Sequence, residues 1–213
     1  MTTTRRHCLT LALPFAVCAS AILALPMAAH AAGPQVGKPA PAFTATDADG
    51  KTVRLADHAG KTVVLEWTNH DCPFVKKLYG GQAMQALQKK WTGAGVVWLT
   101  VVSSAPGEQG AVDAGEANRL TQERGASPTG VILDPTGIVG KAYDARTTPQ
   151  MFVITGDGTL VYQGAIDDKP TANLDDLKTA KNYVDAALTE ISGGKAVSVT
   201  TSKPYGCSVK YSS

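Results

Sequence analysis

The chain has 213 residues, of which 44% are hydrophobic and 18% are charged. Its 20 basic and 18 acidic residues nearly balance and form no basic tract, so we expect no nucleic-acid partner. The length is enough for one well-buried domain, even after the N-terminal leader described next is set aside.

The first 31 residues have the pattern of a secretory signal peptide. Arg5 and Arg6 precede an apolar stretch over 9–27, and residues 29–31 supply a small-x-small cleavage pattern. We expect cleavage after Ala31, by a Sec or a twin-arginine route, which would make the protein periplasmic or secreted. No second apolar span follows, so we expect no membrane contact after cleavage.

Cleavage of this leader would remove two of the four cysteines and leave Cys72 and Cys207. Export places a protein in a compartment where disulfides persist. The two remaining thiols can form a structural bridge, a redox-active pair, or two unrelated thiols. Composition alone does not choose among these three.

After the leader, the hydrophobic pattern alternates between strand and helix signals. The runs over 62–67 and 96–102 are mainly apolar, and such runs are typical of strands covered on both faces. In chain order, we predict a hairpin over 43–46 and 52–55, a strand over 62–67, a helix from Cys72 to Trp91 that breaks at Gly80 and Gly81, a strand over 96–102, a helix over 116–124, a strand over 131–133, a helix over 138–143, a hairpin over 151–154 and 159–162, and a helix over 174–191.

This order of elements predicts one α/β domain over residues 32–192. We expect a central mixed sheet flanked by helices, with the first hairpin as an N-terminal extension. No internal repeat or linker divides the domain, and residues 193–213 are expected to form a C-terminal tail that carries Cys207.

Cys72 lies where the strand over 62–67 gives way to a helix. We expect Asn69 or Asp71 to cap that helix, and Pro73 is tolerated in its first turn because the missing N–H has no partner there. The free N–H groups and the positive end of the helix dipole favour a thiolate over a thiol. Cys72 is therefore the candidate nucleophile, and the alternative is an inert, buried thiol.

Several segments together resemble the thioredoxin superfamily, and within it the peroxiredoxin-like branch (AhpC/TSA, redoxin). They are the lead over 36–43, the strand–cysteine–helix unit over 62–76, Thr148-Pro149 before an apolar strand, and the hairpin at 157–158. The resemblance implies a thioredoxin-like fold and an oxidoreductase or antioxidant activity. It also implies that Pro149 is cis and that the backbone of Thr148 faces the active cysteine, where a substrate strand would pair.

Two departures from the familiar motifs narrow this resemblance. Val75 stands where thioredoxins carry a second cysteine, and no Pro-x-x-x-Thr-x-x motif of typical peroxiredoxins precedes Cys72. The chain is closer to peroxiredoxin-like proteins with a single Asn-His-x-Cys-Pro-type site. Their C-terminal pattern, Gly-Cys-x-(Ile/Val)-Lys-aromatic, is matched by residues 206–211.

Four other side chains are candidates for roles around Cys72. Cys207 is either a resolving cysteine that attacks an intermediate on Cys72 or half of a permanent bridge. His70 is a candidate proton shuttle, because a histidine side chain can take up and release a proton in the working pH range. Glu66 is either edge-exposed or a buried carboxylate with a raised pKa that relays protons. Trp67 is expected to be a core residue.

The leading prediction is an exported redox protein that acts on a protein or small-molecule disulfide or on a peroxide. A reducing thiol partner would restore it, and no cofactor and no metal site are predicted. The alternative is a non-catalytic thioredoxin-like binding or scaffold module with a structural Cys72–Cys207 disulfide. The sequence leaves the oligomeric state open.

Overall fold

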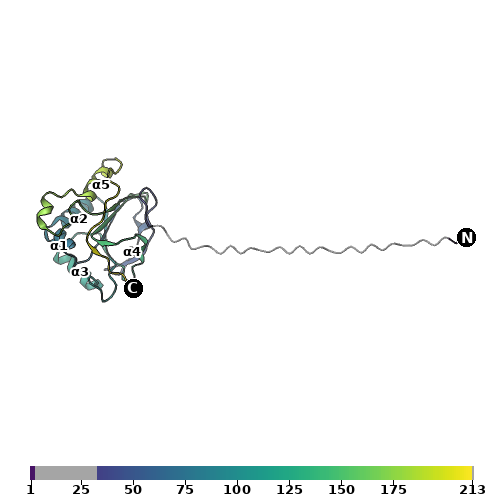
Figure 1. The fold of residues 1–213 in the computed structure, drawn as a ribbon, viewed down its shortest axis with the longest axis horizontal. Helices are drawn as coiled ribbons and strands as arrows, with labels where there is room; N and C mark the ends of the chain where they lie inside the picture. Colours follow the sequence, from purple (N-terminus) through teal and green to yellow (C-terminus); the bar gives the residue numbers. More distant parts are fainter. Residues whose placement is uncertain (3–32, 213) are drawn as a thin grey trace. The chain divides into compact units, whose positions relative to one another are not determined.

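The computed structural model describes residues 1–2 and 33–212 of the chain (Figure 1). The predicted signal peptide, residues 1–31, lies outside the described residues apart from Met1 and Thr2. Seven strands of the described part form one mixed sheet in the order β2-β1-β5-β4-β3-β7-β8. They are β1 (Thr44–Asp47), β2 (Thr52–Arg54), β3 (Val63–Trp67), β4 (Val97–Val102), β5 (Gly130–Leu133), β7 (Gln150–Ile154) and β8 (Leu160–Gly164).

Helices cover both faces of this sheet. They are α1 (Pro73–Gly80), α2 (Ala83–Gly93), α3 (Ala114–Glu123), α4 (Ile138–Ala142) and α5 (Tyr183–Ser192), with two 3-10 helices, η1 (Leu55–His58) and η2 (Leu174–Lys178). Figure 1 shows α1, α2, α3 and α5 on one side of the domain and α4 on the other. The prediction of an α/β domain with a helix-flanked mixed sheet is confirmed.

β3 lies inside the sheet, parallel to β4 and antiparallel to β7. Leu65 stands opposite Leu99 on one side and opposite Phe152 on the other. All five residues of β3 are buried, as its apolar residues predict and with Glu66 buried among them. Because successive side chains alternate between faces, Val64 joins the core layer of α1, α2 and α5, whereas Leu65 and Trp67 join the layer that contains α4.

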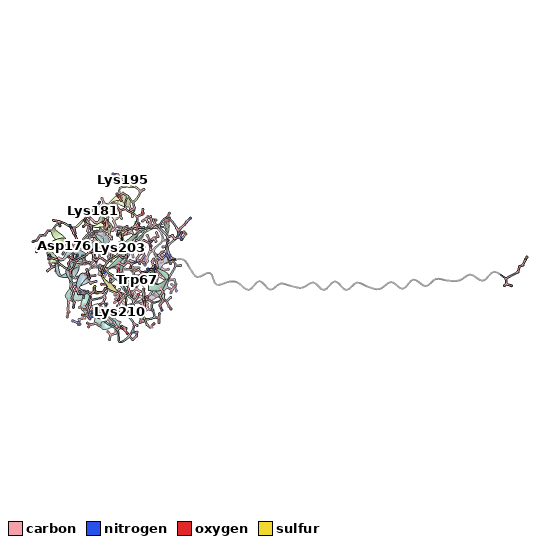
Figure 2. The ribbon with its side chains drawn as sticks, in the orientation of Figure 1. Trp67, Asp176, Lys181, Lys195, Lys203 and Lys210 are labelled. Atoms are coloured by element: carbon pink, nitrogen blue, oxygen red, sulfur yellow. The ribbon has the colours of Figure 1, made fainter. Side chains whose placement is uncertain are left out.

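Trp67 is a core residue, as predicted. Its ring is fully buried and meets the ring of Phe152 edge to face at 5.2 Å between centroids. Its indole N–H donates to Ser103 Oγ (3.0 Å), which satisfies the only polar atom of the side chain. Figure 2 shows Trp67 inside the domain, whereas the exposed Lys181 and Lys195 lie at its edge.

The predicted helix after Cys72 breaks where the sequence indicates. α1 ends at Gly80 and α2 begins at Ala83. A Cβ atom on Gly81 would lie 2.2 Å from Leu177 Cδ1, so the glycine allows η2 to approach the end of α1 closely.

The prediction of one helix over 174–191 is wrong. Residues 174–178 form η2, and α5 starts only at Tyr183. The Asn182 side chain accepts from the backbone N–H of Asp185 and begins a new helix, while the Tyr183 N–H donates to the Ile166 carbonyl. The cap at Asn182 therefore starts a separate helix, although the apolar spacing continues across this point.

The N-terminal hairpin extends the sheet at one edge. β1 pairs antiparallel with β2 and with β5, which confirms the predicted extension. None of the helices in the described residues is long and apolar enough to cross a membrane.

Candidate functional site

Backbone hydrogen bonds set the turn that carries Cys72. Asn69 Oδ1 accepts from the N–H of Asp71 (2.9 Å), and the Asn69 carbonyl accepts from the N–H of Cys72 (3.1 Å). Cys72 is itself the N-cap residue of α1, with Pro73 as the first helical residue. The expectation that Asn69 or Asp71 caps this helix is therefore wrong, because the Asn69 oxygen is used inside the turn.

Cys72 is fully buried against the loop that precedes β7. Its thiol donates to the carbonyl oxygen of Thr148 (Sγ–O 3.0 Å). The Thr148–Pro149 peptide bond is cis, as the family resemblance implies. The buried Thr148 hydroxyl has no hydrogen-bond partner among the described residues.

The C-terminal segment brings the second cysteine to the same place. β6 (Thr147–Thr148) and β9 (Cys207–Ser208) pair antiparallel, with Cys207 opposite Thr148. Gly206 makes this pairing possible: its φ is +129°, and a Cβ atom there would lie 2.0 Å from the Thr148 carbonyl oxygen. The two cysteines, distant in sequence, therefore share one site, and both are free thiols.

Tyrosine side chains and backbone bonds hold this segment in place. The Tyr205 hydroxyl donates to Asp167 Oδ1 (2.5 Å), and the Tyr211 hydroxyl donates to the Ala145 carbonyl (2.6 Å). The N–H of Val209 donates to the Arg146 carbonyl (3.0 Å), and that of Ala105 donates to the Lys210 carbonyl (2.7 Å). The segment is thus anchored on both sides of Cys207.

The pKa values of the two thiols are shifted in opposite directions. Burial raises the pKa of Cys72, but the hydrogen bonds that its thiolate would accept outweigh this effect, so the pKa lies below the ordinary thiol value. The donors are the Cys207 side chain, the backbone N–H groups of Val75 and Cys207, and the Thr148 side chain. Burial, together with the hydrogen bond to Cys72 and the charge on Cys72, raises the pKa of Cys207 to about 12. The first thiolate of the pair therefore lies on Cys72.

Glu66 lies in β3 on the same face of the sheet as Trp98. It is fully buried, which excludes the edge-exposed alternative. Tyr79, Gln88 and Trp98 donate to its carboxylate at 2.8 to 2.9 Å, and Thr100 donates at 3.4 Å. Burial raises its pKa, and the hydrogen bonds from Trp98, Tyr79 and Gln88 offset only part of that. A proton-relay role for Glu66 stays a prediction.

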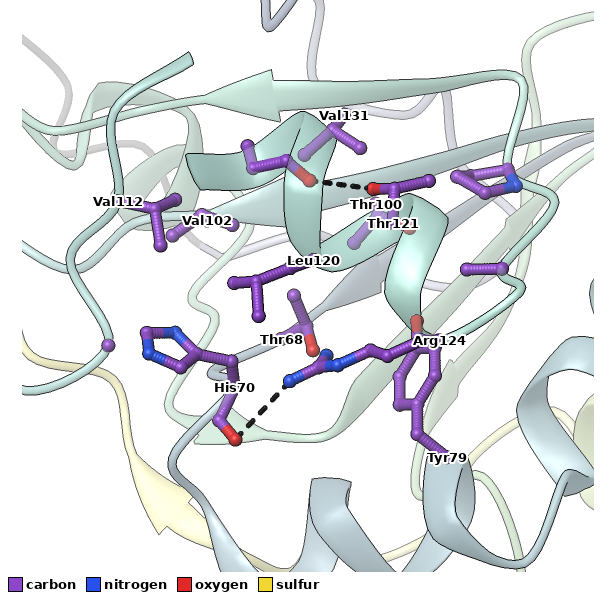
Figure 3. A pocket seen from close by; sticks show the side chains of 14 residues that line it. Thr68, His70, Tyr79, Thr100, Val102, Val112, Leu120, Thr121, Arg124 and Val131 are labelled. Atoms are coloured by element: carbon purple, nitrogen blue, oxygen red, sulfur yellow. Dashed lines mark hydrogen bonds between the residues drawn. The ribbon is translucent and has the colours of Figure 1, made fainter. Parts of the chain in front are cut away.

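His70 lies two positions before Cys72 in the segment that connects β3 to α1. Its ring nitrogen Nε2 is 3.4 Å from Asp71 Oδ2, and its side chain lines a pocket together with Thr68 and Arg124 (Figure 3). Cys72 does not line that pocket. The predicted shuttle role of His70 stays untested.

Sequence reasoning did not assign a role to several residues that lie around the two cysteines or line the neighbouring pocket. Gly206 and Tyr205 position Cys207, and the Gly-Cys pair in the tail pattern was their one local signal. Thr68 and Arg124 carry no motif that marks them. No group of three or more potential metal ligands gathers within the described residues.

Comparison with solved structures gives the fold. An uncharacterized conserved protein from Geobacillus kaustophilus is 29% identical, with a TM-score of 0.72 over 84% of this chain and 93% of its own. A hypothetical protein from Sinorhizobium meliloti 1021 is 23% identical, with a TM-score of 0.70 over 84% and 96% of the two chains. A candidate thiol:disulfide interchange protein DsbE from Chlorobium tepidum is 24% identical, with a TM-score of 0.50 over 62% and 85%. The fold is thioredoxin-like.

Sequence comparison gives the family. No curated protein matches the chain. A family model described as the AhpC/TSA family matches residues 36–163, which is more than half of the chain and includes Cys72, Thr148 and Pro149. This match supports a thiol redox function and an oxidoreductase activity. The chain belongs to the AhpC/TSA family.

Proposed function

We propose that the protein is an exported thiol oxidoreductase in which Cys72 is the nucleophile and Cys207 is the resolving thiol. The observation that carries this proposal is the pairing of Cys207 with Thr148, which accepts the hydrogen bond of the Cys72 thiol. The lowered pKa of Cys72 favours the thiolate there, and the thiolate is the attacking species. Cys207 keeps its proton and its place beside the nucleophile.

Thr148 and Pro149 are positioning residues in this proposal. The Thr148 carbonyl accepts from the thiol, and its unpartnered hydroxyl is available to donate to the thiolate. Pro149 has no N–H, so the loop directs only carbonyl and side-chain groups toward the sulfur at this point. His70 would move protons only through the solvent near its half-buried ring.

Two oxidants fit the same pair of sulfurs. With a hydroperoxide, the Cys72 thiolate attacks an oxygen, the O–O bond breaks, an alcohol or water leaves, and Cys72 becomes a sulfenic acid. Cys207 then attacks that sulfur, water leaves, and a Cys72–Cys207 disulfide forms. With a small disulfide, the S–S bond of the substrate breaks to give a mixed disulfide on Cys72, and Cys207 releases the second thiol. A dithiol reductant returns both cysteines to thiols.

Mass spectrometry of single-cysteine variants tests these roles. The reduced protein is treated with a stoichiometric amount of hydrogen peroxide or oxidised glutathione, and the free thiols are then alkylated. The wild-type protein should form the Cys72–Cys207 bridge. Cys207→Ser should stop at a sulfenic acid or a glutathione adduct on Cys72, and Cys72→Ser should remain unmodified. Oxidant consumption by Cys72→Ser at the wild-type rate would contradict the proposal.

The reduction potential of the bridge separates this proposal from the scaffold alternative. A redox-active pair should equilibrate with glutathione or thioredoxin-type couples, whereas a structural disulfide has a potential below about −300 mV. Equilibration with defined thiol buffers, followed by alkylation, measures the value. A potential below that limit would favour the non-catalytic module.

Export is the remaining part of the proposal and rests on the pattern over 1–31. Expression of the full chain in a bacterium, followed by fractionation and intact-mass measurement, should find a periplasmic or secreted form that begins at or near Ala32. A full-length cytoplasmic product would contradict it.

A further inference from the structure

A pocket beside the segment 68–72 is lined by Thr68 and His70 but by neither Cys72 nor Cys207. Its cavity volume is about 40 Å³, or about 430 Å³ when all the space between its walls and the part open to solvent are counted. Its walls come from the ends of β3 and β4, from β5, from α3 and from the loop before α3 (Figure 3). Six of the 14 residues that line it are aliphatic: Val102, Val112, Ala117, Leu120, Ala126 and Val131.

Thr68 places an unsatisfied hydroxyl in this apolar pocket. The residue is only 7% exposed, and its Oγ1 has no hydrogen-bond partner among the described residues. Its backbone N–H is used, because it donates to the Val101 carbonyl (3.0 Å). A buried hydroxyl without a partner lowers stability, so a ligand that bonds it would recover that loss.

Arg124, the residue that ends α3, supplies a positive charge in the same pocket. Its guanidinium lies 4.8 Å from the centre of the Tyr79 ring and donates to the His70 carbonyl at the long distance of 3.4 Å. No carboxylate of the described residues lies within ion-pair distance of it. Figure 3 shows Thr68 and Arg124 side by side in the centre of the pocket.

The neighbouring acids already have partners. Asp71 pairs with His70 and Lys76, and Glu116 pairs with Arg119. The charge of Arg124 is the smallest of several influences on the pKa of Glu66. Four side chains already donate hydrogen bonds to the Glu66 carboxylate. The guanidinium therefore keeps donors free for a ligand.

We propose that this pocket binds a small apolar molecule that carries one carboxylate. The guanidinium of Arg124 and the hydroxyl of Thr68 offer donors for the two carboxylate oxygens, and the aliphatic wall takes the apolar body. The proposal is independent of the redox role of Cys72. Its occupant would touch Thr68 and His70, which belong to the segment that leads to Cys72.

Benzoate is a suitable probe, and benzyl alcohol is its uncharged counterpart. Both are titrated into the reduced full-length domain while backbone amide shifts are followed by NMR. Benzoate should bind saturably and shift the amides of Thr68, Gly110 and Val112, and benzyl alcohol should bind at least about tenfold more weakly. Absence of saturable shifts at the pocket, or equal affinity for the two probes, would overturn the proposal.

Two variants and a matched control sharpen the test. Arg124→Gln should weaken benzoate binding at least about tenfold, whereas Arg119→Gln, an exposed arginine on the same helix, should leave it unchanged. Thr68→Val should also weaken benzoate while keeping or raising stability, because it removes an unpartnered hydroxyl. Unchanged benzoate affinity in Thr68→Val and Arg124→Gln would refute the assigned ligand class. If Arg124→Gln fails to fold, the benzoate and benzyl alcohol comparison on the wild-type protein decides.

Discussion

The turn that carries Cys72 and the segment that carries Cys207 support their sulfur atoms in different ways. Cys72 is the more buried of the two thiols, and yet it is the more acidic. Burial by itself raises both pKa values, so exposure does not explain the order. Cys72 lies at a helix N-terminus and receives donors from Val75 and from Cys207 itself, whereas Cys207 faces a developing charge. The pKa of each thiol is thus set by whether its neighbours donate hydrogen bonds to the thiolate or place a negative charge beside it.

The supports beneath the two regions also differ. The turn follows β3, whose buried carboxylate at Glu66 connects the strand to α1 and α2 through hydrogen bonds. The C-terminal segment is held by two strand-paired residues, a glycine that fits against Thr148, tyrosine hydroxyl groups and a few backbone hydrogen bonds. We therefore expect changes beneath the turn to affect the whole fold, and changes in the segment to affect mainly the distance between the sulfurs.

Glu66→Leu should have the largest effect. It leaves the donors of Tyr79, Gln88 and Trp98 buried without an acceptor, so the free energy of unfolding should fall by roughly 3–6 kcal/mol. Glu66→Gln is the matched control and should lose about 1 kcal/mol, because its amide oxygen still accepts. Urea denaturation measures both. Equal stability of the two variants would show that these hydrogen bonds do not support the turn.

Gly206→Ala should separate the two sulfurs while leaving the domain folded. The new Cβ would meet the Thr148 carbonyl at 2.0 Å, and φ at this residue is +129°. Formation of the Cys72–Cys207 disulfide should slow by roughly tenfold to a hundredfold, a barrier change of about 1–3 kcal/mol. Gly194→Ala is the control, since φ there is +68° and no atom lies within 4 Å of its Cβ position. Stopped-flow oxidation followed by alkylation gives the rate, and an unaffected Gly206→Ala would contradict the geometry.

Cys207→Ala should raise the pKa of Cys72 and so make this thiol less acidic. It removes the side-chain hydrogen bond that lowers this pKa, so the rate of attack on a small disulfide should begin to fall at a higher pH as the solution is acidified. Cys207→Ser keeps a hydroxyl donor and should shift the profile less. Single-turnover rates across pH, with ultraviolet thiolate absorbance as a check, measure the midpoint. A profile identical to that of the wild-type protein would show that Cys207 does not lower the pKa of Cys72.

Tyr205→Phe should have the smallest effect of these changes. It removes the hydrogen bond to Asp167 but keeps the ring against Phe74. We expect a loss of about 1–3 kcal/mol in the local stability of the segment and little change in the core. Hydrogen exchange at Cys207 and Ser208 should speed up, whereas exchange in β3 should stay slow. Equal exchange in the variant and the wild type would show that Tyr205 is not an anchor.

Local signals were sufficient for the turn but not for its partner segment. A strand, a polar turn and Pro73 mark the place of Cys72 directly in the sequence, and the resemblance to a known fold marks Pro149. β9 has two residues and a partner far away in the chain, so no periodicity indicates it. The apolar spacing continues across the gap between η2 and α5, and the cap at Asn182 is the local signal that marks this gap. Thr68 and Arg124 meet only through tertiary packing.

The pairing of β9 with β6 has a consequence for substrate access under the proposed function. In β-strand addition, an extended peptide binds through main-chain hydrogen bonds to an open edge. Here the edge at Thr147–Thr148 is already filled by the chain's own Cys207–Ser208, which would act as a tethered competitor at high effective concentration. We expect that a protein substrate would have to displace this segment, and the second sulfur with it, before it could pair. A small oxidant would need only a path to one sulfur, so we expect the segment to select substrates by size.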